Sequence, residues 1–166
     1  FRKHCKRFFG EESISSAAFD SRVTNMRMRY REQTVFAQLN LLDSHDVSRF
    51  YSLCNEHEWQ YRLALIFQMT FPGMPSVFYG DELGITGIEE ADYRQAMPWK
   101  KACKAKDTEE KELREKSFEQ NSSDSLFAFM RSLIQLRRKE ELLRRGDFRT
   151  VYTQEKGGLY IYERYS

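Results

Sequence analysis

Apolar positions along the chain group into short runs and helical stripes that alternate in a regular order. Residues 35–42, VFAQLNLL, are apolar and branched enough to predict a strand buried on both faces. Residues 58–71 place large apolar side chains at helical spacing, and Pro72-Gly73 predicts the end of that helix. SVFY at residues 76–79 predicts a second buried strand. The order strand, helix, strand predicts a βαβ unit, and therefore a parallel sheet with helices on its faces.

The flanking segments predict further helices. Residues 1–31 mix charged and apolar side chains in a way typical of one or two helices. Residues 100–116 are rich in Lys and Glu at i,i+4 spacing, which predicts a solvated helix without a function of its own. Residues 124–140 carry one apolar stripe and end in basic residues, so they predict an amphipathic helix.

The last part of the chain changes its pattern. FRTVYT and LYIYER flank QEKGG, which predicts a β-hairpin within residues 148–164. The Tyr-rich alternation of these two strands differs from the preceding order of strand, helix and strand. We therefore place a domain boundary near Arg145 and Gly146. Residues 1–145 are then one unit, and residues 146–166 begin an antiparallel β domain.

Composition limits the classes of partner and compartment. The chain has 166 residues, 40% of them hydrophobic, and a formal net charge of +2, which argues against nucleic acid or an anionic membrane surface as a partner. Its apolar run LALIF is too short to span a bilayer. The N-terminus shows neither a signal peptide nor a Met, so we expect a processed chain or a piece of a longer one. Three separated cysteines without a C-x-x-C predict free thiols in a reducing compartment, here the cytoplasm.

Ionisable residues follow both predicted strands. Ser44, His45, Asp46 and Arg49 come after the first strand, and Gly80-Asp81-Glu82 comes after the second. In parallel α/β folds reactive residues collect beyond the carboxyl ends of strands. Adjacent Ser, His and Asp cannot form a hydrolase triad, and no G-x-S-x-G is present. As a bare pattern, His-Asp is more typical of a helix cap than of a catalytic pair.

Three longer motifs carry a family resemblance. NLLDSHDVSRF, FQMTFPGMPSVFYGDELGITG and DYRQAMPW occur in this order, and they resemble the α-amylase family of glycoside hydrolases, in particular its neopullulanase, cyclomaltodextrinase and maltogenic amylase group. The resemblance extends over nearly the whole chain. It implies part of a (β/α)₈ barrel, with residues 35–42 as strand seven, 76–79 as strand eight and 124–140 as the last barrel helix. The segment from Phe148 onward would open the C-terminal β domain.

The resemblance also implies roles for site residues. Asp46 would be the third catalytic carboxylate, which stabilises an oxocarbenium-like transition state, and His45 would bond a hydroxyl of the cleaved sugar. Arg49 would shape the substrate site, and Asp92 and Arg94 would contact the next sugar. Further residues of the motifs are expected to be structural: Asp81 and Glu82 at the barrel mouth, and Trp99 in the core.

A retaining glycosidase needs a nucleophilic carboxylate and a general acid about 5 Å apart. The family supplies both from strands before strand seven, and no matching motif precedes residue 35. A complete barrel takes about 250 residues. We therefore expect a C-terminal part of such an enzyme, inactive alone, whose substrates when complete are α-glucan oligosaccharides. The missing part of the barrel, or self-association, would cover its open sheet edge. No cofactor is expected; some members bind calcium, but no calcium site is identifiable in the sequence.

Two other readings compete with a glycosidase. A non-enzymatic accessory module can share the barrel without its activity, but the retained Asp46 and the lack of a membrane helix favour an enzyme. A basic interaction domain built on LRRKEELLRRGDFR disagrees with the charge balance.

Overall fold

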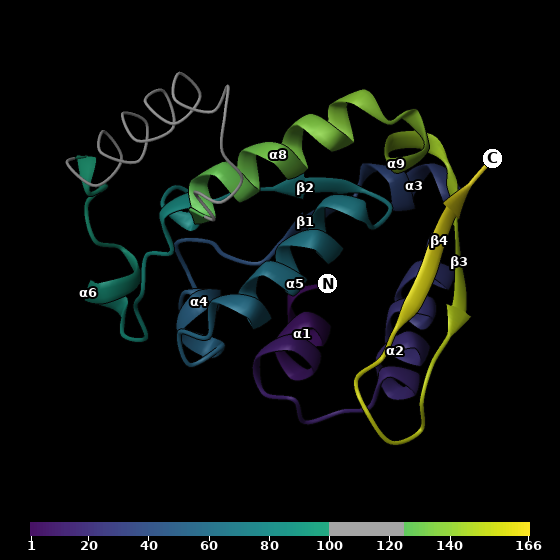
Figure 1. Ribbon diagram of the computed structural model, residues 1–166, viewed down its shortest axis with the longest axis horizontal. Coiled ribbons are helices and arrows are strands. Elements are labelled where there is room, and N and C mark those ends of the chain that lie inside the picture. The colour runs from purple at the N-terminus through teal and green to yellow at the C-terminus, as the bar shows by residue number, and fades with distance from the viewer. Residues whose placement is uncertain (100–124) are drawn as a thin grey trace, which may run out of the picture.

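The computed structural model describes residues 1–99 and 125–166. The predicted solvated helix at residues 100–116 lies outside the described residues. The chain folds around a short parallel sheet, flanked by helices and by a C-terminal hairpin (Figure 1). In chain order the elements are α1 (Arg2–Cys5), the π-helix η1 (Lys6–Gly10), α2 (Ser16–Met28), α3 (Glu32–Ala37), β1 (Leu39–Leu41), α4 (Phe50–Leu53), α5 (Glu58–Thr70), β2 (Met74–Ser76), the 3₁₀ turn η2 (Asp81–Leu83), α6 (Glu90–Tyr93), α8 (Leu126–Lys139), α9 (Glu141–Arg145), β3 (Asp147–Tyr152) and β4 (Ile161–Tyr165).

The two central strands pair in parallel, as the βαβ prediction requires. Leu39 lies opposite Met74, and Leu41 lies opposite Ser76. Gln68 of the connecting helix α5 ties the unit together, because its side-chain amide donates to Asn40 O and to Ser76 O, both at 2.9 Å. A buried glutamine thereby satisfies carbonyls of both strands from the helix that covers them.

Both strands are shorter than the sequence pattern predicts. β1 lies inside the predicted range 35–42, whereas β2 begins two residues before the predicted range 76–79. Of the predicted strand 35–42, residues 35–37 belong to helix α3, where Val35 is buried on the inner side. The predicted strand 76–79 shares only Ser76 with β2, because β2 ends at that residue. There the backbone leaves the sheet: Phe78 N donates to the side chain of Asp81 at 2.9 Å, and Gly80 adopts φ +85°. A short apolar run alone does not distinguish a strand from a buried helix or turn.

The predicted helices agree better with the structure. Helix α5 covers the predicted segment 58–71, and α8 covers 124–140 from Leu126 onward. Ser125 begins α8 by accepting from Ala128 N at 3.1 Å, and Ser15 begins α2 in the same way. In the N-terminal segment the prediction of one or two helices is confirmed by α1, η1 and α2.

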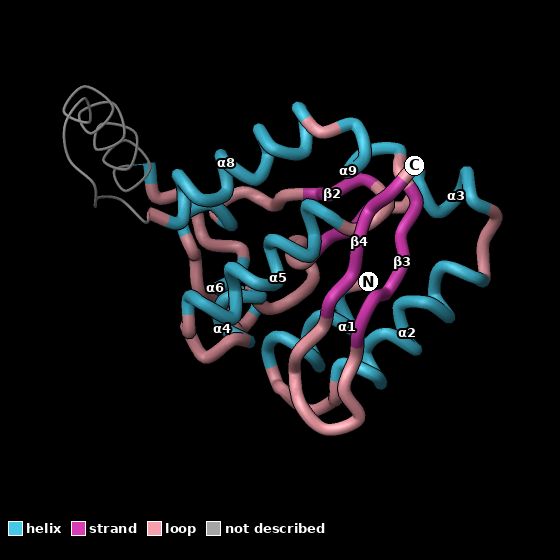
Figure 2. Tube along the Cα trace, turned by 45° about the vertical axis from the view of Figure 1, so that its right-hand side comes forward, coloured by secondary structure: helices cyan, strands magenta, loops and turns pink. Residues whose placement is uncertain are grey.

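The C-terminal hairpin is antiparallel, as predicted, with Asp147 opposite Tyr165. Figure 2 shows it running beside α2 and α5. Phe148 is buried in the same apolar core as Phe67 and Phe71 of the βαβ unit. The hairpin loop also bonds to α2, because Ser16 N donates to Gly157 O at 3.0 Å. The hairpin therefore shares a core with the preceding residues, and the division into domains at residue 145 stays a prediction.

Two further properties concern the described residues as a whole. Cys5 and Cys54 are buried free thiols, as the cysteine spacing predicts. Among residues 1–99 and 125–166, no helix combines the length and apolarity needed to cross a bilayer.

Candidate functional site

Three loops meet where the parallel strands end. The loop after β1 carries His45 and Asp46, the loop after β2 leads through Asp81, and the segment after α6 brings Arg94. The carboxyl ends of parallel strands lie at one edge of a sheet, so these loops converge although they are distant in sequence. Arg94 contacts Asp46 across 48 positions of the chain.

The Asp46 carboxylate is open to solvent and held from two sides. Its Oδ2 lies 3.2 Å from His45 Nε2, and its Oδ1 lies 3.4 Å from Arg94 Nη2. Arg94 is itself oriented by Glu90 (Nη1–Oε1, 2.7 Å), and its Nε donates to His45 O at 2.7 Å. The side chains of His45 and Asp46 remain 70% and 65% exposed. The structure therefore brings together three of the predicted site residues and leaves their polar atoms accessible to a ligand.

Arg49 lies in a different environment, although it belongs to the same loop. Its side chain is fully buried, and Nη1 donates to Tyr79 O at 2.8 Å and approaches Asp81 Oδ1 at 3.4 Å. Its guanidinium lies over the rings of Phe78 and Tyr79, and Nε donates to Tyr93 O at 3.2 Å. In this structure Arg49 presents no surface to a ligand and contacts the loops that form the site.

Behind the Asp46 loop, two carboxyl groups are buried in hydrogen-bonding contact with each other. Asp43 is 4% exposed and Asp81 is 2% exposed. Burial raises the pKa of both groups, and the pKa of Asp81 rises well above its usual range because Asp43 adds a nearby negative charge. Arg49 opposes these effects, since its positive charge favours the ionised form of each carboxyl.

The remaining predicted residues lie at the margin of the site. Asp92 is exposed on α6, and its backbone carbonyl accepts from Gln95 Nε2 at 2.9 Å. Asp81 is buried as expected of a structural residue, whereas Glu82 is half-buried beside it. The prediction that Trp99 belongs to the core is wrong, because its side chain is 70% exposed. The aromatic character of Trp99 and its position after Pro98 do not by themselves predict that the side chain is buried.

Within residues 1–99 and 125–166, no group of three or more His, Cys, Asp or Glu side chains could hold a metal ion.

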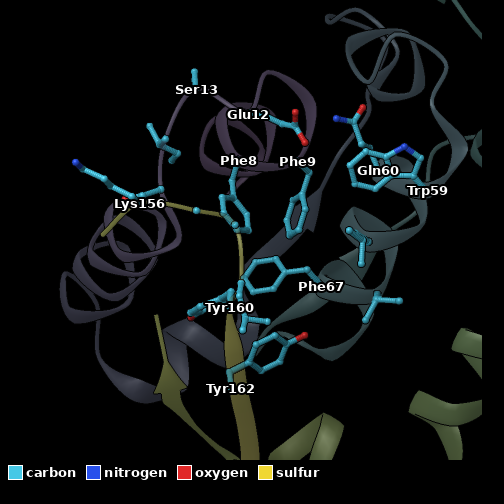
Figure 3. Close-up of a pocket in the computed structure, with 17 residues that line it drawn as sticks. Phe8, Phe9, Glu12, Ser13, Trp59, Gln60, Phe67, Lys156, Tyr160 and Tyr162 are labelled. Atoms are coloured by element: carbon cyan, nitrogen blue, oxygen red, sulfur yellow. The ribbon is translucent and has the colours of Figure 1, made fainter. Parts of the chain in front are cut away.

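A separate groove lies away from the strand ends (Figure 3). It has a volume of about 830 Å³ and lies between η1, the start of α5 and the hairpin loop. Its floor is aromatic, with Phe8, Phe9, Phe67 and Tyr160 among the lining residues. None of the predicted site residues lines it. The groove and the polar residues around Asp46 are therefore in different parts of the molecule. We choose the candidate site by the polar residues around Asp46 rather than by the size of the groove.

Sequence reasoning missed two members of the site. Glu90 orients Arg94, and its signal was the i,i+4 spacing of an acidic and a basic residue. Asp43 directly follows the apolar pair Leu41-Leu42, where a buried carboxylate needs a partner. That partner, Asp81, lies on another loop, so local sequence could not identify it.

Comparisons with known proteins identify the family of this chain. The family described as "Alpha amylase, catalytic domain" matches residues 7–146. Neopullulanase 2 of Thermoactinomyces vulgaris is 39% identical over 164 residues, which are 99% of this chain and 25% of that protein. A cyclomaltodextrinase of Thermoanaerobacter pseudethanolicus is 34% identical over 92% of this chain and 23% of its own length.

Solved structures resemble the fold as well. A cyclomaltodextrinase superposes with a TM-score of 0.83 at 26% identity, over 99% of this chain and 25% of that one. A debranching enzyme from Nostoc punctiforme gives a TM-score of 0.71 at 29% identity, over 91% of this chain and 27% of that one. The chain spans about a quarter of the length of the curated relatives it matches. The resemblance seen in the sequence motifs is confirmed: the chain forms part of the barrel fold and belongs to the α-amylase family, where it is similar to neopullulanases and cyclomaltodextrinases.

Proposed function

We propose that this chain supplies the transition-state-stabilising side of the active site of a retaining glycoside hydrolase that acts on α-glucans. Its relatives include proteins named neopullulanase, cyclomaltodextrinase and amylopullulanase. The observation that carries the proposal is the solvent-facing Asp46 carboxylate, held by His45 and Arg94 at the carboxyl end of β1.

The chemistry of that carboxylate fits the reaction. Glycosidic cleavage develops positive charge on the sugar ring, in an oxocarbenium-like transition state. A fixed anion beside this charge stabilises it, and the effect grows when the cleft excludes water. Arg94 and His45 hold both oxygens of Asp46 in place, so the anion needs little reorganisation during the reaction. His45 keeps an exposed ring that can bond a sugar hydroxyl, and Arg94 and Asp92 lie where a neighbouring sugar would bind.

The nucleophile and the general acid of the proposed reaction come from outside this chain. Two carboxyl groups in a retaining enzyme are about 5 Å apart and face the reacting carbon. Asp43 and Asp81 do touch each other, but both are buried, so they cannot reach a substrate. We expect the 166-residue chain to be inactive alone and a longer chain containing it to cleave maltooligosaccharides or cyclodextrins.

The test is kinetic and uses such a longer chain. Asp46→Asn keeps the shape of the side chain and removes its charge, so kcat should fall by a factor on the order of 10³, as for other preorganised electrostatic stabilisers. Asp147→Asn removes an exposed carboxylate outside the site and serves as the matched control. If Asp46→Asn retains nearly normal kcat, the carboxylate is only a helix cap, and the proposed role of Asp46 in the reaction is wrong.

The open edges of the central sheet support a partner as well. The sheet formed by β1 and β2 has two strands within the described residues, and Leu39 and Met74 expose 61% and 47% of their surface there. Unpaired edges with apolar side chains favour association. The proposed partner is the remainder of the barrel or, in its absence, a second copy of this chain.

Light scattering tests association of the 166-residue chain. The wild type should form oligomers as its concentration rises, and Leu39→Lys with Met74→Lys should shift it toward the monomer. Met28→Lys changes another exposed Met, 79% accessible on α2, and should have no such effect. A compact monomer at high concentration would contradict the proposal.

The free thiols Cys5 and Cys54 support a reducing compartment, for which we propose the cytoplasm.

A further inference from the structure

A buried cluster lies directly beneath the loop that carries His45 and Asp46. It consists of Asp43, Arg49 and Asp81, each 4% exposed or less. Asp43 Oδ1 accepts from Phe50 N at 2.7 Å and so fixes the start of α4. Asp81 Oδ2 accepts from Phe78 N at 2.9 Å and so fixes the turn after β2. The contact between the two carboxyls joins these two segments.

Arg49 adds the third segment of the site. Its backbone N donates to Gly87 O at 2.8 Å, and its Nε donates to Tyr93 O at 3.2 Å. Tyr93 directly precedes Arg94, whose Nε bonds to His45 O. Arg49 is therefore linked to the Asp46–Arg94 contact through one backbone carbonyl.

The ends of the loop are held from the opposite side by Arg2. Its Nε donates to Leu42 O at 2.5 Å, and its Nη2 donates to Ser48 O at 2.6 Å. Two arginines thus hold the backbone on either side of Asp46, and the exposed part of the loop between them is short.

We propose that Arg49, Asp43 and Asp81 are positioning residues, which hold the Asp46 loop against the segment of Arg94 by means of one proton kept between the two carboxyls. Two carboxylates in contact inside a protein cannot both ionise without strong repulsion. A shared proton turns that repulsion into a hydrogen bond, and Arg49 compensates the remaining negative charge. The effect on catalysis rests on the proposed function, whereas the positioning can be measured without any activity.

Charged and titratable groups face the pair from each packed element. Arg2 of α1 and Arg49 at the start of α4 contribute positive charge. Cys54, after α4, feels the negative charge of Asp43, and together with burial this raises the pKa of its thiol to about 12. Tyr61 of α5 donates its hydroxyl to Asp81 O at 3.2 Å, and burial raises its pKa well above the ordinary value. Burial therefore favours the neutral form of both neighbours.

The first experiment measures amide exchange by NMR in the 166-residue chain, corrected for the intrinsic effect of pH. The readouts are the amides of Arg49 and Phe50, with amides of α5 as the reference for global opening. Asp43→Ala should make both exchange about tenfold faster relative to α5, the size expected for losing a hydrogen bond to a charged group. Asp43→Asn should stay close to the wild type, because an amide can accept from Phe50 N and donate to Asp81. Glu155→Gln, an exposed change of the same charge, is the control.

The dependence on pH distinguishes a shared proton from simple packing. As the pH rises through the raised pKa values of the pair, the wild type should lose protection at Arg49 and Phe50 because the pair ionises, and Asp43→Asn should show no such loss. If Asp43→Ala fails to fold, this comparison decides alone. The carbon signals of the two carboxyl groups should report a proton retained above the usual range of Asp. Two carboxyls that titrate normally, or an Asn variant with the wild-type loss, would overturn the proposal.

The second experiment follows the Nε–H signals of arginine side chains. Arg49→Lys keeps the charge but removes the bond to Tyr93 O, so Arg94 Nε–H should exchange about tenfold faster. Arg62 Nε–H, bonded to Glu58 at 2.8 Å on the surface of α5, should not change. Equal changes at Arg94 and Arg62 would show a general loosening and would contradict a positioning role.

Discussion

The loop after β1 carries two aspartates with opposite environments. Asp46 is 65% exposed and contacts Arg94, which is also largely in water. Asp43, three positions earlier, is 4% exposed and shares its environment with Asp81 and the fully buried Arg49. Both carboxylates lie near a guanidinium and at the end of the same strand. The difference shows that solvent access, rather than residue type or neighbour type, separates the carboxylate that we propose to bind substrate from the one that is buried within the fold.

The same comparison applies to the two arginines. Arg94 gains little from its exposed ion pairs, because water screens them and side-chain entropy opposes them. Arg49 is removed from water and contacts two carbonyls, a carboxyl group and two aromatic rings, while its Nη2 is buried without a hydrogen-bond partner among the described residues. Removing a buried partner leaves the others without compensation, which costs far more than the pair itself contributes.

The largest expected effect on stability concerns Arg49. Arg49→Met should lower the free energy of unfolding by about 3 kcal/mol, the lower end of the range for breaking a buried pair, because Asp81 can respond by binding a proton. Urea unfolding followed by circular dichroism measures the change. Arg94→Met is the matched control and should cost below about 1 kcal/mol. Equal losses for the two variants would remove the distinction between the buried and exposed sites.

A pH series tests the buried pair next. The folded-state pKa values of Asp43 and Asp81 are raised. At pH values between the unfolded-state pKa and the folded-state pKa of these groups, the native state therefore binds more protons than the unfolded state. Stability should therefore fall as the pH rises through this window, by at most about 1.4 kcal/mol per pH unit for each extra proton. Asp43→Asn should flatten the slope, whereas Asp46→Asn should leave it unchanged. Urea unfolding at a series of pH values measures the free energy of unfolding of the wild type and of both variants. A free energy of unfolding that rises with pH in the wild type would contradict the raised pKa values.

The smallest effect is expected for His45. In a longer, active chain, His45→Ala should lower kcat about fivefold, because it removes one hydrogen bond worth roughly 1 kcal/mol. Steady-state kinetics on one maltooligosaccharide measures this, with His57→Ala, an exposed position just before α5, as the control. A loss as large as that expected for Asp46→Asn would mean that His45 contributes charge or proton transfer to the reaction.

Local sequence determined the elements whose signals are local. The apolar stripes and caps of α5 and α8 predict these helices, and the glycine turn predicts the hairpin of β3 and β4. The order strand, helix, strand also predicts the parallel pairing of β1 and β2. The motifs around Asp46, Gly80 and Arg94 are specific enough to identify the family from the amino-acid sequence alone.

Only the tertiary structure decided where the strands lie and which side chains meet. The apolar run at residues 35–42 is compatible with a helix and with a strand. In the structure residues 35–37 end α3 and residues 39–41 form β1, and the side chain of Gln68 donates to carbonyls at Asn40 in β1 and Ser76 in β2. The contacts of Asp46 with Arg94 and of Asp43 with Asp81 join different loops. No periodicity within one segment encodes these contacts, because their geometry depends on partners that the chain brings together only when it folds.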